Sequence, residues 1–228
     1  MRILVLVLSS DNGEPYRSFE EQIRRYSKSH KNIDYYFYKG HNGPTELKGD
    51  TLYLNCDDGW NGIYTKTMLA FRYFEPVLDN YDFVFRPNLS SFIVLPRYYT
   101  IMKVMPKTRM CAAFIGTVDN DLVYPSGAGF TLSTDVVKML CKENVDNPLY
   151  HQAQDDINVG YFLKQYKIPI IAMERATIED GENVVELWKN NPSAYHFRIK
   201  TSDRMKDIES IKRLYSLAYE FKFSDRFI

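Results

Sequence analysis

Two short stretches of the sequence carry side chains that could do chemistry. In the first, an apolar run at residues 83–85 is followed by Arg86, Asn88 and Ser90. The run predicts a buried strand, which Pro87 ends because it removes a ladder donor. Ligands bind beyond the carboxyl ends of strands in open α/β sheets, so these polar side chains are candidates for ligand binding. A polar turn after a core strand is the alternative interpretation.

The second stretch is an acidic pair, Asp155 and Asp156, at the start of an expected helix. The helix dipole and the free backbone N–H groups keep a carboxylate ionised at this position, so that it can take a proton. Neighbouring helix residues point about 100° apart, and we expect Asp155 to cap or orient rather than react. A purely structural charge pair at a helix N-terminus is the alternative.

Strands and helices alternate along the chain. Strands are expected at residues 3–8, 33–38, 51–56, 82–88, 109–116, 129–132 and 168–173. Helices are expected around residues 19–26, 63–78, 97–104, 134–140, 155–166 and 204–221. Residues 174–200 are expected to be irregular. This alternation predicts an α/β fold with a mostly parallel sheet, in which residues 1–200 form one domain and a helix in 201–228 packs on it.

Composition excludes several classes of partner. The chain of 228 residues has a formal net charge of +0 and no charge run, so neither a nucleic acid nor an anionic membrane is expected to bind it. The apolar run at residues 3–8 is too short to cross a membrane. The three cysteines, Cys56, Cys111 and Cys141, form no CxxC motif. Their odd number fits a reducing compartment, and we expect a cytoplasmic protein.

Several familiar motifs are absent from the sequence. There is no GxGxxG after the first strand, no GxxxxGK[ST] loop, no HExxH and no GxSxG. The histidines are not paired at metal-ligand spacing. Trp60 and Trp188 could stack on a sugar or a base, or could belong to the core.

Four stretches together resemble a known family. They read DGWNGIYTKT at 58–67, RPNLSS at 86–91, SGAGFTLS at 126–133 and QDDINVGYFL at 154–163. Their order and gaps resemble the fringe-type and β-1,3-galactosyltransferase-like glycosyltransferases over residues 50–165. The viral and bacterial members, with an RTNLSS-like strand end, are the most similar. The resemblance implies a GT-A fold and inverting transfer from a nucleotide sugar, usually a UDP-sugar, to a saccharide or other acceptor hydroxyl.

The same resemblance implies roles for individual residues. Asp156 matches the general base of the family, and Asn88-Leu89-Ser90 occupies the position of its metal-binding DxD triplet. His196 resembles the histidine that helps to hold the metal. The donor-binding residues that we expect are Ser9, Ser10, Asp58, Lys66, Arg86, Asn88, Ser90, Gly127 and Gly129.

The triplet departs from the family because it contains no carboxylate. Mn²⁺ and Mg²⁺ favour anionic oxygen ligands, so Asn88, Ser90 and His196 would form a poor metal site. Arg86 could stabilise the leaving diphosphate directly. Transfer with little or no need for metal is therefore expected. The alternatives are a nucleotide- or glycan-binding module that has lost transfer and, less favoured without a glycine-rich loop, another nucleotide-using enzyme such as a methyltransferase.

Overall fold

An eight-stranded sheet forms the centre of the protein, which is described here from a computed structural model covering residues 1–118, 122–144 and 154–220. The strand order is β3-β4-β2-β1-β5-β8-β7-β9. The strands are β1 Ile3–Leu8, β2 Ile33–His41, β3 Glu46–Lys48, β4 Thr51–Asn55, β5 Phe83–Pro87, β7 Cys111–Val118, β8 Leu122–Ser133 and β9 Ile170–Ala172. Strands β4, β2, β1 and β5 are parallel neighbours, as are β7 and β9. Strand β3 pairs antiparallel with β4, and β8 pairs antiparallel with both β5 and β7. The predicted mixed, mostly parallel sheet is confirmed.

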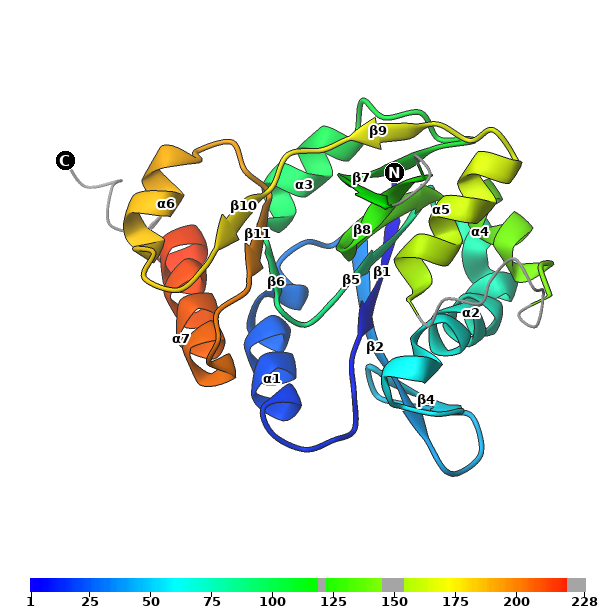
Figure 1. The fold of residues 1–228 in the computed structure, drawn as a ribbon, viewed down its shortest axis with the longest axis horizontal. Helices are drawn as coiled ribbons and strands as arrows, with labels where there is room; N and C mark the ends of the chain where they lie inside the picture. Colours follow the sequence, from blue (N-terminus) through cyan, green and yellow to red (C-terminus); the bar gives the residue numbers. More distant parts are fainter. Residues whose placement is uncertain (119–121, 145–153, 221–228) are drawn as a thin grey trace.

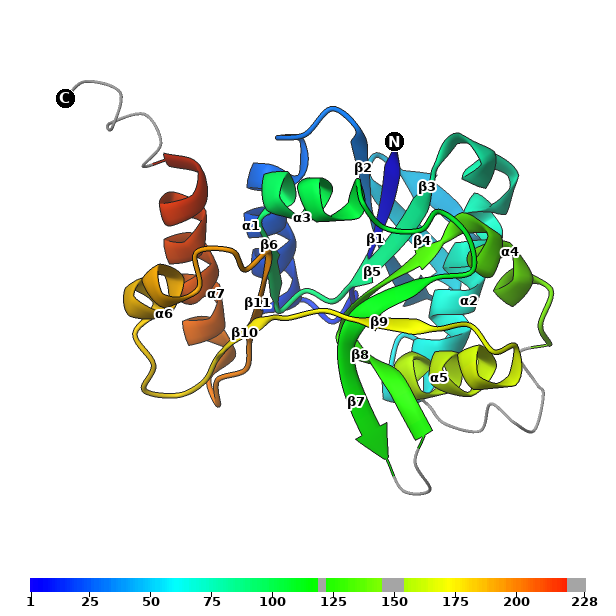
Figure 2. The ribbon, with the colours of Figure 1, turned by 90° about the horizontal axis from the view of Figure 1, so that it is seen from above.

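Helices cover both faces of this sheet. They are α1 Tyr16–Ser27, α2 Ile63–Phe74, α3 Leu95–Met102, α4 Thr134–Cys141, α5 Asp155–Gln165, α6 Val184–Asn190 and α7 Arg204–Tyr215. Figures 1 and 2 show α1, α3 and α7 on one side of the sheet and α2, α4 and α5 on the other. Strand β1 contributes to both apolar clusters, because Val5 faces the first group of helices and Leu4 and Leu6 face the second. The continuous apolar run in β1 follows from this double coverage.

A second, three-stranded sheet corrects one expectation. It has the order β10-β11-β6 and consists of β10 Ala176–Ile178, β11 His196–Ile199 and β6 Ser91–Ile93. Residues 174–200, expected to be irregular, therefore contain two strands and helix α6. Strands of three or four residues are too short to show a full hydrophobic period, so periodicity did not predict them.

The C-terminal helix α7 packs on the main domain. Its apolar residues Ile208, Ile211 and Leu214 join the same cluster as Phe19 and Tyr26 of α1. A π-helical turn, Ser216–Glu220, follows the helix. The last residues of the segment expected at 201–228 lie outside the described chain. Across the described ranges, every helix is too short or too polar to cross a membrane.

Several strand ends meet at one edge of the large sheet. Leu8, the last residue of β1, forms an isolated parallel bridge with Asn88, just past β5, and Pro87 pairs with Gly129 of β8. Helix α5 begins at Asp155 and packs against β8. The first turn of α5 and the ends of β1 and β5 are therefore close in space, although they are far apart in the sequence.

Candidate functional site

A cavity of about 570 Å³ opens at this edge of the sheet. Most of the residues expected to form a site line it: Ser9, Ser10, Asp58, Lys66, Arg86, Asn88, Ser90, Gly127, Asp155 and Asp156. Gly129 and His196 do not line it. The structure thus brings together residues that are far apart in the sequence, from Ser9 to Asp156, a separation of almost 150 positions.

The carboxylate of Asp156 is fixed at the cavity by two backbone groups. Its Oδ2 accepts the N–H of Gly127 at 2.7 Å, and its Oδ1 accepts the N–H of Ile157 at 2.9 Å. A Cβ at position 127 would lie 2.6 Å from Oδ2, so only glycine allows this approach. The side chain is half-buried and remains able to meet a ligand in the cavity.

Asp155 forms a buried ion pair with Arg86 at the back of the cavity. Its carboxylate lies 2.7 Å from the guanidinium, and both side chains are only 2% exposed. It also accepts a hydrogen bond from Thr67 at 2.7 Å. Burial raises the pKa of Asp155, and the charge of Arg86 opposes that rise. These contacts suit the orienting role that was expected of Asp155.

Arg86 uses much of its hydrogen-bonding capacity in contacts within the protein. Besides Asp155, it donates to the carbonyl of Gly127 at 2.5 Å and to the hydroxyl of Tyr38 at 3.3 Å. A guanidinium has five donors, and three of them are used by these contacts. Arg86 therefore links the start of α5 to the part of β8 that carries Gly127, and it is less free to bind a phosphate than the sequence suggested.

Asp58 holds two loops together. Its Oδ1 accepts the N–H of Gly40 and the ammonium of Lys66, each at 2.7 Å. Its Oδ2 accepts the hydroxyl of Ser10 at 2.5 Å and the N–H of Asp11 at 2.7 Å. Burial alone would raise the pKa of Asp58, but the hydrogen bonds from Lys66 and Ser10 outweigh it and leave the pKa lowered. With about four lone-pair sites filled, the carboxylate positions the loops rather than offering a free oxygen.

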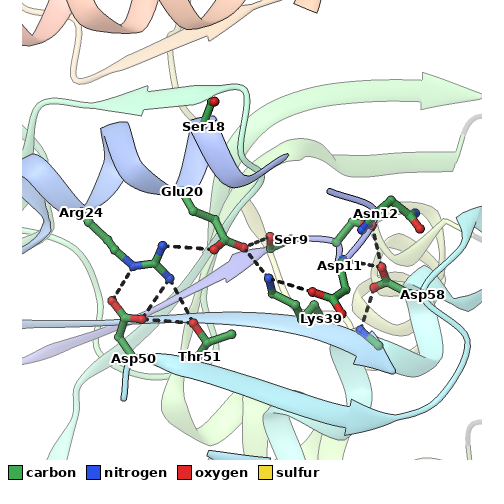
Figure 3. A network of polar contacts seen from close by, with 12 residues as sticks. Ser9, Asp11, Asn12, Ser18, Glu20, Arg24, Lys39, Asp50, Thr51 and Asp58 are labelled. Carbon is green, nitrogen blue, oxygen red and sulfur yellow. Dashed lines mark hydrogen bonds and ion pairs between the residues drawn. The ribbon is translucent and has the colours of Figure 1, made fainter. Parts of the chain in front are cut away.

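A second polar network fixes Ser9 from behind the cavity (Figure 3). Its hydroxyl donates to Glu20 of α1 at 2.5 Å, and Glu20 also meets Lys39 at 3.0 Å and Arg24 at 3.1 Å. Glu20 and Lys39 are both buried, so the charge of each is stabilised by the opposite charge of the other. The hydroxyls of Ser9 and Ser10 are thus both tied to carboxylates, and they shape the loop after β1.

His196 and Gly129 take part in packing. His196 is 1% exposed, and its Nε2 lies 2.9 Å from the hydroxyl of Ser91. Burial, followed by the charges of Arg175 and Arg198, lowers the pKa of His196 to about 3, so the imidazole is neutral at pH 7. A Cβ on Gly129 would lie 3.2 Å from the ring of His196, which makes position 129 a close packing contact.

The position of the DxD triplet already holds a cation. Nη1 of Arg198 donates to Asn88 Oδ1 at 2.8 Å and to Ser90 Oγ at 2.5 Å. Within the described ranges, no three His, Cys, Asp or Glu side chains gather in a group that could hold a metal ion. Two neutral oxygens that face a guanidinium are a poor fit for Mn²⁺ or Mg²⁺, which favour anionic oxygen ligands.

Sequence reasoning missed the basic residues that line the other wall of the cavity. These are Arg175, Arg198, Lys200 and Arg204, which come from the β10, β11 and α7 segments. One signal was present: residues 195–199 read YHFRI, an aromatic and β-branched run between turn-forming residues, which is typical of a short strand.

The two tryptophans have different environments. Trp60 is 63% exposed and lines the cavity, so its ring is available to a ligand. Trp188 packs on Phe197 with ring centroids 5.3 Å apart and lies under Arg97. It is partly buried and packs against the apolar cluster that contains Phe197.

Comparisons with known proteins identify the fold. No protein-family model and no curated protein matches the sequence. The structure is similar to a glycosyltransferase involved in the glycosylation of the major capsid of PBCV-1, with a TM-score of 0.55 and 11% identity over 93% of this chain and 100% of that chain. An active-site mutant of LgtC is similar with a TM-score of 0.46 and 10% identity, covering 86% of each chain. The likeness to the PBCV-1 enzyme shows a GT-A-like glycosyltransferase fold.

Proposed function

We propose that this protein is an inverting glycosyltransferase that moves a sugar from a UDP-sugar to the hydroxyl of a saccharide or another acceptor. The observation that carries the proposal is the placement of Asp156: a half-buried carboxylate, held by the N–H of Gly127, at a cavity on a glycosyltransferase fold. Fold alone does not decide function, so the chemistry of this side chain is central.

In the proposed reaction, Asp156 acts as the general base. The acceptor O–H gives its proton to the carboxylate while the oxygen lone pair forms a bond to the anomeric carbon. The bond from that carbon to the β-phosphate oxygen breaks, and its electron pair leaves with UDP. Attack opposite to the leaving group inverts the anomeric configuration. Base assistance of this kind contributes about 10²–10⁴-fold to the rate.

The remaining cavity residues seat the donor. Lys66 is 2% exposed and donates to Asp58 and to the carbonyl of Ser9, so it locks the loops that would enclose the nucleotide. Trp60 offers an exposed aromatic face on which a base or a sugar can stack. The turn at Asn88 and Ser90 also lines the cavity and accepts hydrogen bonds from Arg198 of its basic wall.

The experiment is a transfer assay with a panel of nucleotide sugars, in which the wild type is compared with Asp156→Asn. The variant keeps the shape of the side chain and removes its basicity, so UDP should bind as before while transfer falls by about 10²-fold or more. Asp135→Asn is the matched control, because Asp135 is the second residue of α4 as Asp156 is of α5, and it lies away from the cavity. The anomeric configuration of the product, read by NMR, tests inversion.

Two outcomes would contradict the proposal. Transfer at a normal rate by Asp156→Asn would remove the assigned base. UDP binding without transfer from any nucleotide sugar would instead indicate a nucleotide-binding module on the same fold.

A further inference from the structure

Arg198 is held over the turn between β5 and β6. Strand β11 pairs antiparallel with β6, which places Arg198 opposite Ser91. From there its Nη1 reaches both Asn88 and Ser90. No other hydrogen bond of the guanidinium is formed within the described part of the chain, so Nε and Nη2 keep their donors for a ligand in the cavity. The side chain is thus both oriented and chemically available.

The cations of the cavity fall into two groups. Lys66, Arg86 and Arg204 are paired with Asp58, Asp155 and Asp207, respectively, each at 2.7 Å. The cavity also contains Arg175, Arg198 and Lys200, for which the described ranges provide no carboxylate within 4 Å.

Arg175 extends this second group toward the base. It donates to Ser126 at 2.6 Å, next to Gly127, and its guanidinium lies 4.1 Å from the ring of Phe114. Its Nε is buried and has no hydrogen-bond partner among the described residues. Buried donors usually have partners, so the arrangement leaves unused capacity for an anionic acceptor.

The positive charges also act on each other. Burial, followed by the charges of Arg204 and Arg175, lowers the pKa of Arg198 to about 10, which still leaves it protonated at neutral pH. Arg204 has a carboxylate partner, Asp207, at 2.7 Å, and the charge of Asp207 opposes this effect. Like charges that are held close without counterions repel each other, and a bound anion lowers this electrostatic energy.

We infer that Arg198, with Arg175 and Lys200 beside it, binds the diphosphate of the donor and stabilises the charge of the leaving group without a divalent metal ion. A guanidinium fixed in advance by Asn88 and Ser90 needs no reorganisation when the negative charge develops. The choice of UDP as the ligand rests on the proposed function, whereas the affinity for a diphosphate does not. Arg198 thereby takes the role that the sequence suggested for Arg86.

The test is isothermal titration calorimetry with UDP, inorganic pyrophosphate and uridine, each with EDTA in the buffer. Wild-type protein should bind UDP with the same affinity, within about twofold, after the EDTA is replaced by Mn²⁺. Arg198→Met keeps an unbranched apolar stem and removes the charged guanidinium. It should weaken UDP and pyrophosphate by about 10- to 100-fold and uridine by less than twofold, as expected for lost charge-assisted hydrogen bonds. Arg198→Lys should recover part of the loss.

Arg97→Met is the matched control. Arg97 is a half-buried arginine that donates to the carbonyl of Ala194 at 2.8 Å, just before β11, and it lies outside the cavity. It should leave all three affinities unchanged. If Arg198 only supported the fold, its loss would weaken uridine as much as UDP, and Arg198→Lys would not help.

Three results would overturn the inference: no binding of UDP or pyrophosphate in EDTA, unchanged binding by Arg198→Met, or equal loss for uridine and UDP. The proposed function fails separately. Pyrophosphate binding through Arg198 in a protein that transfers no sugar would uphold the anion site and reject the enzyme. Transfer that needs Mn²⁺ and tolerates Arg198→Met would do the reverse.

Discussion

Gly127 and Asp156 approach so closely that the backbone N–H of one donates to Oδ2 of the other at 2.7 Å, which leaves no room for a side chain at position 127. We expect Gly127→Ala to displace the carboxylate, because its Cβ would otherwise lie 2.6 Å from Oδ2. Transfer should fall by about 10²-fold, since small misplacements of a catalytic group are costly. Steady-state kinetics with UDP affinity measured in parallel would check this.

The effect of Gly127→Ala should depend on Asp156. In an Asp156→Asn background the glycine substitution should cost little more, because both changes remove the same base. Additive losses would mean that Gly127 contributes to something other than the position of Asp156.

Substitution of the two neighbouring acids, Asp155 and Asp156, should have different effects on the free energy of unfolding. Asp155→Asn leaves Arg86 buried without its partner, and breaking a buried ion pair from one side costs about 3–5 kcal/mol. Asp156→Asn removes no such pair and should change the free energy of unfolding by less than about 1 kcal/mol. Urea unfolding of both variants gives the comparison. Similar stabilities would show that the pair of Asp155 and Arg86 is not important for folding.

A carboxylate at position 88 should create a metal site only when the guanidinium of Arg198 is removed. Asn88→Asp alone should form an ion pair with Arg198 and weaken UDP binding, with no response to Mn²⁺. Asn88→Asp combined with Arg198→Met supplies a carboxylate without the competing guanidinium, and here Mn²⁺ should raise the UDP affinity at least tenfold. Calorimetry with and without Mn²⁺ distinguishes the two variants. A strong response of the single variant would mean that Arg198 is easily displaced.

His196 should make the protein sensitive to mild acid. Its pKa is lowered from 6.5 to about 3 in the folded protein, so between these values the unfolded chain binds a proton that the folded one does not. Stability is therefore complete above pH 6.5 and is lost as the pH falls. The loss should be about 1 kcal/mol per pH unit between pH 6 and 5. Urea unfolding at pH 7, 6 and 5 should show a flatter dependence for His196→Gln, and equal slopes would show that His196 does not titrate in this way.

The sequence predicted the large sheet better than the site. A strand such as β1 is long, apolar and covered on both faces, so local pattern and burial agree. The same holds for the acidic start of α5, where composition alone indicates a helix N-terminus. Local pattern is a strong guide wherever one element is long enough to show its own period.

The partners of the charged residues could not be predicted from the sequence. Arg86 was named as a phosphate ligand because it follows a strand, but its pairing with Asp155 depends on how α5 packs against β8. Arg198 was missed because β11 has only four residues and pairs with the three-residue β6. Contacts between residues far apart in the sequence are set by the packing of the elements, and the local hydrophobic pattern of the sequence does not indicate them.

The antiparallel pairing of β6 and β11 also has a consequence for the order in which the protein matures. Arg198 meets Asn88 across 110 positions of sequence, so the segment that supplies the basic wall is synthesised after every strand of the large sheet. Contacts of such long range form slowly compared with local ones. A nascent chain that has emerged only as far as β9 already holds every strand of the large sheet, together with Asp156 and Gly127, but not Arg198. We therefore expect ribosome-bound intermediates of this length to be folded in their main sheet and unable to retain UDP.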